Sequence, residues 1–166
     1  MASVVGKTTV GVALTILPGT GDGALDEMQR ILLQADPDHD WTYGTGDYQV
    51  TKWYENLDVG LTVSGSSSTS VDLNTLTGLA GETVNFSGVK LIWVYNPSTT
   101  VGDTFTIEGN FFTVNIGAQF GIMPGSCLFV PSPITQFAVV NAVSDTLTFT
   151  NNAATSKVVK YFLAGV

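Results

Sequence analysis

Hydrophobic and polar residues alternate along several short stretches of the chain. In "DTFTIEG", Phe105 and Ile107 alternate with hydroxyl and carboxyl side chains, and in "DTLTFTN" Leu147 and Phe149 alternate with threonines. The stretch "NLDVGLTV" has the same period, and its predicted apolar face carries Leu57, Val59, Leu61 and Val63. A period of two is typical of strands in antiparallel sheets, which have one buried and one solvated face.

Turn signals separate these stretches at intervals of roughly 8 to 12 residues, which favours a β-sandwich or barrel over alternating strands and helices. They include "NPSTTVGD", "GSSSTS", "MPG" and "NNAATS". Both faces are apolar in "VKLIWVYN", so this strand is expected in the middle of a sheet, covered on both sides. We therefore predict an all-β, antiparallel fold of about eight to ten strands.

The beginning of the chain has a different pattern. Residues 25–34, "LDEMQRILLQ", predict a short helix that Pro37 ends. The apolar residues of this helix have helical spacing: Leu25, Met28, Ile31 and Leu32. We predict two parts, namely residues 1–46 as a mostly irregular N-terminal arm with a strand, one short helix and an acidic loop, and residues 47–166 as the β-sandwich domain.

Charged residues make up only 12% of the chain, and the net charge is −8. Residues 1–58 carry nine of the 14 acidic residues and three of the six basic ones, so most of the negative charge lies there. Affinity for nucleic acid and for anionic membranes comes mainly from clustered lysine and arginine, which this chain lacks. We expect neither partner, and a neutral, hydroxyl-rich surface of this kind suits packing against other protein.

The single cysteine, Cys127, stands in "GSCLFV". It cannot form an internal disulfide, and its apolar neighbours predict an ordinary buried thiol. No run reaches the roughly 18 apolar residues of a membrane span. The segment "TTVGVALTILPG" lacks the small-residue cleavage site of a signal peptide. These features predict a protein made in a reducing cytoplasm.

The sequence contains no catalytic signature. "VVGKTTVG" lacks the first glycine and the preceding strand of a phosphate-binding loop. His39 is the only histidine and lies between aspartates in "DPDHDW", which predicts a solvated loop rather than a catalytic or zinc site. We therefore predict that the protein is not an enzyme and has no catalytic residue, no metal and no cofactor.

The acidic loop is nevertheless the best candidate for a metal site. Asp36, Asp38 and Asp40 follow the opening of a calcium loop, and Asp47 falls at the twelfth position. Trp41 stands at the sixth position, where the loop needs glycine, so a regular calcium hand is excluded. An irregular calcium site and a solvated acidic loop both remain open, and the solvated loop is favoured.

Five aromatic residues gather in "WTYGTGDYQVTKWY": Trp41, Tyr43, Tyr48, Trp53 and Tyr54. Aromatic rings form hot spots at protein interfaces, and beside glycine and aspartate they also stack on sugars. Core packing, a protein interface and glycan binding all remain open for this group. The protein interface is its predicted functional role.

The order of segments in residues 47–166 resembles a group of small virion proteins from tailed bacteriophages. The resemblance rests on the shapes of strands and turns. It begins with a tryptophan-bearing strand, a hydroxyl-rich strand that ends in "VDL", and the long apolar strand "KLIWVYN". It continues with "PGSCLFVPSP", where a strand ends in proline, and closes with the pair "DTLTFTNNAATSKVVKYFLAGV".

The resemblance implies a jelly-roll-like β-sandwich that is a structural part of the virion. Many such proteins decorate or cement the outer capsid surface as homotrimers bound to the major capsid protein, and an N-terminal arm often reaches the capsid or a neighbouring subunit. We therefore expect a capsid decoration protein, made in the host cytoplasm. Two alternatives remain, namely a glycan-binding head-fibre or receptor-binding module, and a structural protein of the tail or neck.

Overall fold

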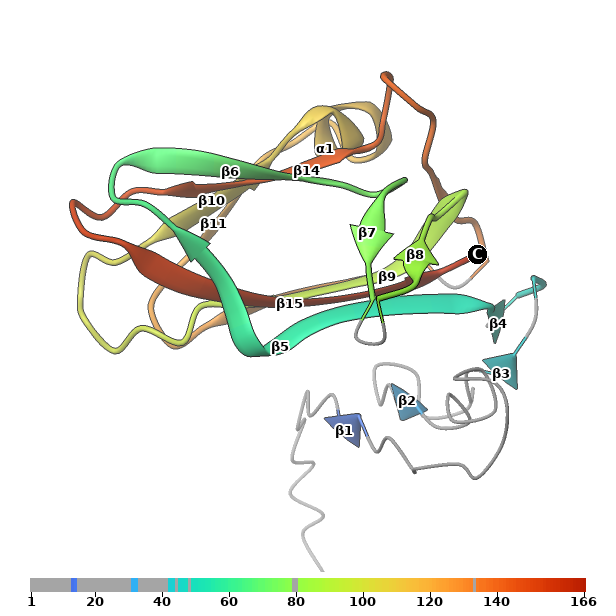
Figure 1. Ribbon diagram of the computed structural model, residues 1–166, viewed down its shortest axis with the longest axis horizontal. Helices are drawn as coiled ribbons and strands as arrows, with labels where there is room; N and C mark the ends of the chain where they lie inside the picture. The colour runs from blue at the N-terminus through green and yellow to red at the C-terminus, as the bar shows by residue number, and fades with distance from the viewer. Residues whose placement is uncertain are drawn as a thin grey trace, which may run out of the picture.

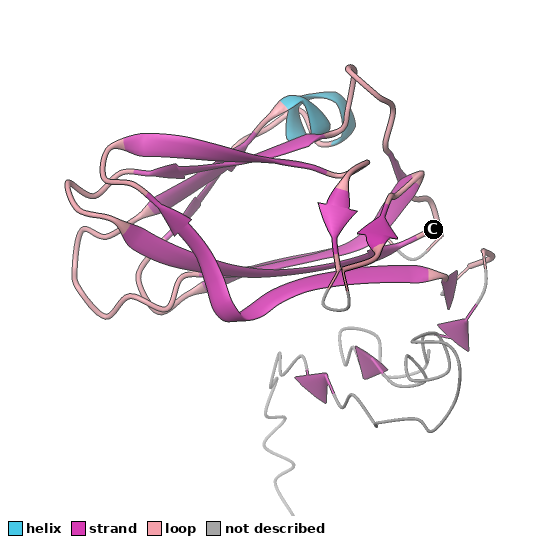
Figure 2. Cartoon of the chain, viewed as in Figure 1, coloured by secondary structure: helices cyan, strands magenta, loops and turns pink. Residues whose placement is uncertain are grey.

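Two antiparallel β-sheets face each other across a hydrophobic core in the computed structural model (Figure 1, Figure 2). The structure describes residues 13–14, 31–32, 42–43, 45–47, 49–78, 81–132 and 134–166. The first sheet contains, in spatial order, β12 (Cys127–Pro131), β9 (Gly88–Tyr95), β15 (Lys157–Gly165) and β5 (Lys52–Val63), with β13 (Phe137–Ala138) also beside β9. The second sheet contains β11 (Phe120–Ile122), β10 (Phe105–Glu108), β14 (Thr146–Asn151) and β6 (Ser67–Asp72).

Shorter elements lie outside these two sheets. They are the antiparallel pair β1 (Ala13–Leu14) and β2 (Ile31–Leu32), the parallel pair β3 (Thr42–Tyr43) and β4 (Gln49–Val50), the antiparallel pair β7 (Leu76–Thr77) and β8 (Thr83–Val84), and helix α1 (Asn110–Asn115). Among the residues that the structure describes, no helix is long and apolar enough to cross a membrane.

The pairing of the long strands is that of a jelly roll. In chain order these strands are β5, β6, β9, β10, β11, β12, β14 and β15. The first pairs with the eighth, the second with the seventh, the third with the sixth and the fourth with the fifth. A single long hairpin that is rolled up produces this order and divides the strands between two facing sheets. The predicted all-β, jelly-roll-like sandwich is therefore confirmed.

The core between the sheets follows the alternation in the sequence. Phe105, Ile107, Leu147 and Phe149 are each 0% exposed, as predicted. The strand predicted to lie in mid-sheet, β9, does lie between β12 and β15. Tyr161 of β15 joins the same core, with its ring centroid 5.1 Å from that of Phe149, and burial raises the pKa of its hydroxyl.

The predicted apolar face of β5 is wrong in its first half. Leu61 and Val63 do pack into the core, but Leu57 packs against a separate cluster and Val59 is 78% exposed. The cause is an irregularity opposite β15, where Val159 pairs with Leu61 but Tyr161 pairs with Asn56. Extra residues in one strand bend it and reverse the facing of the side chains that follow. Figure 1 shows the resulting bend in β5.

Two further expectations need correction. Ile31 and Leu32, placed in a helix over residues 25–34, form strand β2 and pair with β1; the rest of that segment lies outside the described residues. Isoleucine is β-branched and accepts an extended backbone readily, so a strand partner can outweigh the helical spacing. Cys127, predicted to be buried, is exposed, because its neighbour Leu128 points into the core and successive side chains of a strand face opposite ways.

Helix α1 was not anticipated from the sequence. It follows β10 directly, and its residues Phe111 and Phe112 are both buried against the core. The proposed division at residue 46 stays a prediction, although the first strand of the sandwich, β5, begins inside the expected domain.

Candidate functional site

The two described side chains of the predicted aromatic interface lie on opposite faces of β5. Trp53 stacks on Phe162 outside the sandwich, with ring centroids 6.4 Å apart. Tyr54 packs inward against Tyr161, at a centroid distance of 5.7 Å. Tyr43 is placed only as part of strand β3, and Trp41 and Tyr48 lie outside the described residues. Trp53 and Tyr54 therefore do not share one patch.

The acidic loop lies almost wholly outside the described part of the chain. This holds for Asp36, Asp38, His39 and Asp40, so the calcium site remains a prediction. Asp47 is described and exposed. Among the residues the structure describes, no three His, Cys, Asp or Glu side chains come together as a metal-binding group.

An apolar surface covers the outer side of the first sheet, and we call it the outer aromatic face. Its buried members are Val50, Leu91, Phe162 and Ala164, and its half-buried members are Trp53, Leu57, Trp93 and Phe129. They come from the region of β4 and from β5, β9, β12 and β15, so the chain assembles this face from segments far apart in the sequence.

Lys90 lies at the Gly46 end of the outer aromatic face and is only 2% exposed. Its ammonium group donates a hydrogen bond of 2.5 Å to the carbonyl oxygen of Gly46. Burial lowers the pKa of Lys90, and the nearby charge of Asp47 opposes that shift. A buried ammonium group needs a hydrogen-bond acceptor or an opposite charge nearby. The segment around Gly46 supplies both to Lys90 and so lies against this end of the outer aromatic face.

The outer side of the second sheet is polar, and we call it the hydroxyl face. Hydroxyl pairs link neighbouring strands, with 2.7 Å between Ser68 and Thr150 and 2.9 Å between Ser70 and Thr148. Thr150 also donates to the Glu108 carboxylate at 2.7 Å. Cross-strand pairs of this kind stabilise a sheet and leave a surface without apolar patches.

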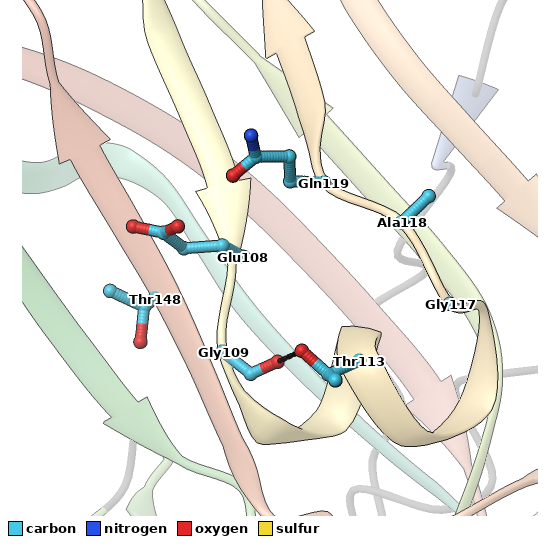
Figure 3. Close-up of a pocket in the computed structure, with 7 residues that line it drawn as sticks. All are labelled: Glu108, Gly109, Thr113, Gly117, Ala118, Gln119 and Thr148. Atoms are coloured by element: carbon cyan, nitrogen blue, oxygen red, sulfur yellow. Dashed lines mark hydrogen bonds between the residues drawn. The ribbon is translucent and has the colours of Figure 1, made fainter.

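A hollow of about 370 Å³ opens where the hydroxyl face meets helix α1 (Figure 3). Its lining consists of Glu108, Gly109, Thr113, Gly117, Ala118, Gln119 and Thr148. The Thr113 hydroxyl donates to the Gly109 carbonyl at 3.0 Å, as Figure 3 shows. Among the residues that the structure describes, Glu108 is the only titratable side chain in the lining, and these residues supply no carboxylate pair of the kind a glycosidase uses.

A second hollow of about 280 Å³ lies at the bend of β5, lined by residues 55–59. Burial, and then the charge of Asp58, raises the pKa of Glu55. Both carboxylates come from one short run of a single strand. They do not flank a space from opposite sides, as the carboxylate pair of a glycosidase does.

The buried carboxylate of Asp145 has a structural explanation. It accepts hydrogen bonds from the Asn110 side chain at 2.9 Å, the Ala142 amide at 2.6 Å and the Thr146 hydroxyl at 3.1 Å. These donors, led by Asn110, lower the pKa of Asp145. A carboxylate saturated in this way joins the loop before β14 to helix α1 and is a poor proton acceptor.

The loop between β9 and β10 is ordered and presents an apolar tip. Asn96 donates to the Asp103 carbonyl at 2.7 Å, and Ser98 donates to the Asp103 carboxylate at 2.7 Å. Val101 at the tip is 96% exposed, and Met123 in the adjoining loop is 63% exposed. The sequence marks these residues only as apolar letters within turn segments, so their exposure was not foreseen.

The ion pair between Lys157 and Asp103 at this end predicts a specific pH dependence. The Lys157 hydrogen bond of 2.6 Å, and then that from Ser98, lowers the pKa of Asp103 below its ordinary value of 3.8. A lowered folded-state pKa stabilises the fold above the ordinary value, and this contribution is lost as the pH falls through 3.8 toward the lowered pKa. The gap in unfolding free energy between the wild type and Asp103→Asn should therefore shrink on acidification, as urea unfolding from about pH 6 to about pH 3 would measure.

The wild type and Asp103→Asn both keep Asp145, so the contribution of Asp145 cancels in the difference between their unfolding free energies. The change of this difference with pH therefore reports on Asp103. A gap that stayed constant over this pH range would show that the Asp103 charge contributes nothing to stability.

Virus coat proteins are among the solved structures that the chain is similar to. The coat protein dimer of Tobacco streak virus matches with a TM-score of 0.36 and 12% identity, over 68% of this chain and 83% of that chain. A second structure of this coat protein, in a C2 crystal form, has a TM-score of 0.32 and 8% identity over the same shares. No family model and no curated protein matches the chain. At these TM-scores the likeness carries no argument about what the chain does.

Proposed function

We propose that this chain is a non-enzymatic structural protein of a tailed-bacteriophage virion, which binds the outer surface of the capsid as a homotrimer and stabilises the shell. The jelly-roll topology is the observation that carries the proposal, together with the resemblance of residues 47–166 to phage virion proteins. Jelly rolls serve as capsid proteins, lectins and cupins, so the surfaces and the interior must separate these classes.

The interior and the hollows favour the capsid class. The space between the sheets is filled with apolar side chains, and the described residues form no metal-binding group there such as a metal-dependent cupin uses. The described residues that line the larger hollow include no aromatic ring on which a sugar could stack.

The ordered end that presents Val101 and Met123 is the proposed contact with the major capsid protein. An apolar anchor on a loop that is already held by hydrogen bonds loses little entropy on binding. Fully burying a valine contributes about 1.5 to 3 kcal/mol. Even a modest contact, repeated many times on the shell, opposes rupture strongly through avidity.

Three lysine side chains already have partners within the chain, which supports a position of this protein on the outer capsid surface, away from the packaged genome. Lys52 donates to Asn85, Lys90 to Gly46, and Lys157 pairs with Asp103. These groups are already partnered, and net negative charge disfavours contact with phosphates.

Light scattering on a sizing column, with and without EDTA, tests the oligomer. We expect a metal-independent trimer of the 17.5 kDa chain. Co-sedimentation with capsid shells then tests binding, and Val101→Asp should weaken it at least about tenfold, because it places a charge in a desolvated contact.

Val114→Asp provides the matched control, since Val114 is 57% exposed on helix α1, at the opposite end of the sandwich. Loss of binding in both variants would contradict the proposed contact. A monomer that binds glycans and not shells would instead support the receptor-binding alternative, and a ring of other symmetry would support the tail or neck.

A further inference from the structure

We infer that strand β6, at the edge of the second sheet, pairs with β6 of a second copy of this chain, antiparallel about a two-fold axis at Ser70. The pairing would join the second sheets of two copies into one continuous sheet. It uses a different surface from the proposed capsid contact around Val101, so the inference and the proposed function can fail independently.

Strand β6 has an open edge. It is the last strand of its sheet and pairs with β14, and none of the described strands lies on its other side (Figure 1). The Leu73 amide donates to the Asp145 carbonyl at 2.8 Å, in register with the ladder between β6 and β14. Bonds to one partner strand come from alternate residues of an antiparallel ladder. Three residues of β6 therefore turn their main-chain groups to the open edge: Ser68, Ser70 and Asp72.

The other three outer strands of the two sheets are protected against an added strand, and β6 is not. Proteins protect edges with short strands, proline, charged side chains and bends. Strand β11 has only three residues, β12 ends at Pro131, and β5 is bent opposite β15 and carries Lys52, Glu55 and Asp58. Strand β6 pairs with β14 without interruption over six residues, and its only charged residue is Asp72 at its end.

The position of the axis follows from the residues that face the edge. A two-fold axis at Ser70 sets Ser70 opposite its own copy and Ser68 opposite Asp72 of the other copy, so all three edge-facing residues are paired. An axis at Thr69 would leave Asp72 without a strand partner, and an axis at Val71 would leave Ser68 without one. The Asp72 carbonyl already accepts from an amide within its own chain, at 3.3 Å, and its second lone pair remains for the new bond.

The side chains of β6 suit a copy of the same strand. The axis at Ser70 places the two Asp72 carboxylates at opposite ends of the contact, each opposite a serine, so like charges do not meet. On the inner side it sets Val71 opposite Thr69 of the other copy. Val71 is only half-buried against the core, and a β-branched neighbour covers more of it.

The contact is small, which determines where it forms. Three residue pairs exchange about six main-chain hydrogen bonds. Such a contact buries far less area than the roughly 1,200 Å² of a stable protein interface. It therefore leaves the trimer expected on a sizing column unchanged and forms where copies are crowded, because a high effective concentration offsets weak affinity.

Disulfide trapping tests the pairing, in a C127S background that removes the exposed native thiol. In C127S/S70C the two new cysteines would face each other with Cα atoms about 5.5 Å apart, within the range of a disulfide. In the matched control C127S/S68C, on the same exposed face, they would lie about 13 Å apart along the strands. Under mild oxidation at high protein concentration, S70C should form dimers at least about tenfold faster than S68C. Equal rates would overturn the inference.

Two mixed samples test the register and the main-chain bonds. C127S/S68C mixed with C127S/D72C should form the mixed disulfide, because these positions face each other only in an antiparallel pair. A contact around a three-fold axis would instead join like positions, and linkage of S68C to itself would overturn the inference. Adding S70P to both proteins should abolish the mixed disulfide. Proline removes an amide that points to the open edge and leaves the ladder to β14 intact; continued linkage would overturn the inference.

Discussion

Replacing Asn151 with alanine should lower the free energy of unfolding by about 3 to 4 kcal/mol. The side chain is 1% exposed, and its amide group donates to the carbonyls of Val63, Ser64 and Thr155 at 2.9 to 3.1 Å. Its own oxygen accepts from the Ala153 amide at 2.9 Å. One side chain thus joins the ends of β5 and β14 to the turn before β15, and its loss leaves buried backbone groups without a partner. Urea unfolding should show a lower midpoint with an unchanged slope.

Asn152→Ala is the matched control at the next position. Asn152 is exposed, and its amide donates only to the hydroxyls of Thr104 and Thr106, at 3.3 and 3.0 Å. This variant should stay within about 0.5 kcal/mol of the wild type. Equal losses at both positions would mean that the buried network is not what stabilises this end of the sandwich.

Gly109→Ala should cost about 3 kcal/mol or more. Gly109 has φ 109° and ψ 171°, a region that residues other than glycine hardly enter. A Cβ atom there would lie 2.3 Å from the Thr146 carbonyl oxygen and 3.1 Å from the Thr148 amide nitrogen. Both belong to the backbone of β14, which pairs with β10 on one side and β6 on the other, so it cannot move away without disturbing the sheet.

Gly117→Ala separates backbone strain from the steric clash. Gly117 follows the other end of α1 with φ 72°, and a Cβ atom at this position would meet no atom within 4 Å. This variant should lose only about 1 to 2 kcal/mol, the cost of a left-handed backbone. Thermal or urea unfolding of both variants measures the difference, and similar losses would remove the clash from the explanation.

These predictions rest on contacts that the sequence indicates to very different degrees. The alternation around Phe105 and Leu147 correctly predicted which side chains enter the core, since the pleat of a strand is a local property. The same rule failed at Leu57 and Val59, because the irregularity in β5 depends on how that strand pairs with β15, almost a hundred residues later. No local pattern contains this information.

The candidate surfaces also differ in how far the sequence alone indicates them. The aromatic residues near the start of the sandwich were visible in the sequence as a group, yet the fold places Trp53 and Tyr54 on opposite sides of one strand. The outer aromatic face was not visible, because Trp53, Trp93, Phe129 and Phe162 come from four strands that only the jelly-roll pairing brings together.

The order of hydrophobic, polar and turn residues alone was sufficient for the all-β class, since strand period and turn chemistry are set over a few neighbouring residues. The resemblance to virion proteins added the jelly roll. Strand partners, the bend in β5, the exposure of Cys127 and the donors around Asp145 were decided by the tertiary structure. They depend on contacts between segments distant in the chain, and the free energy of those contacts outweighs local preference at each of these positions.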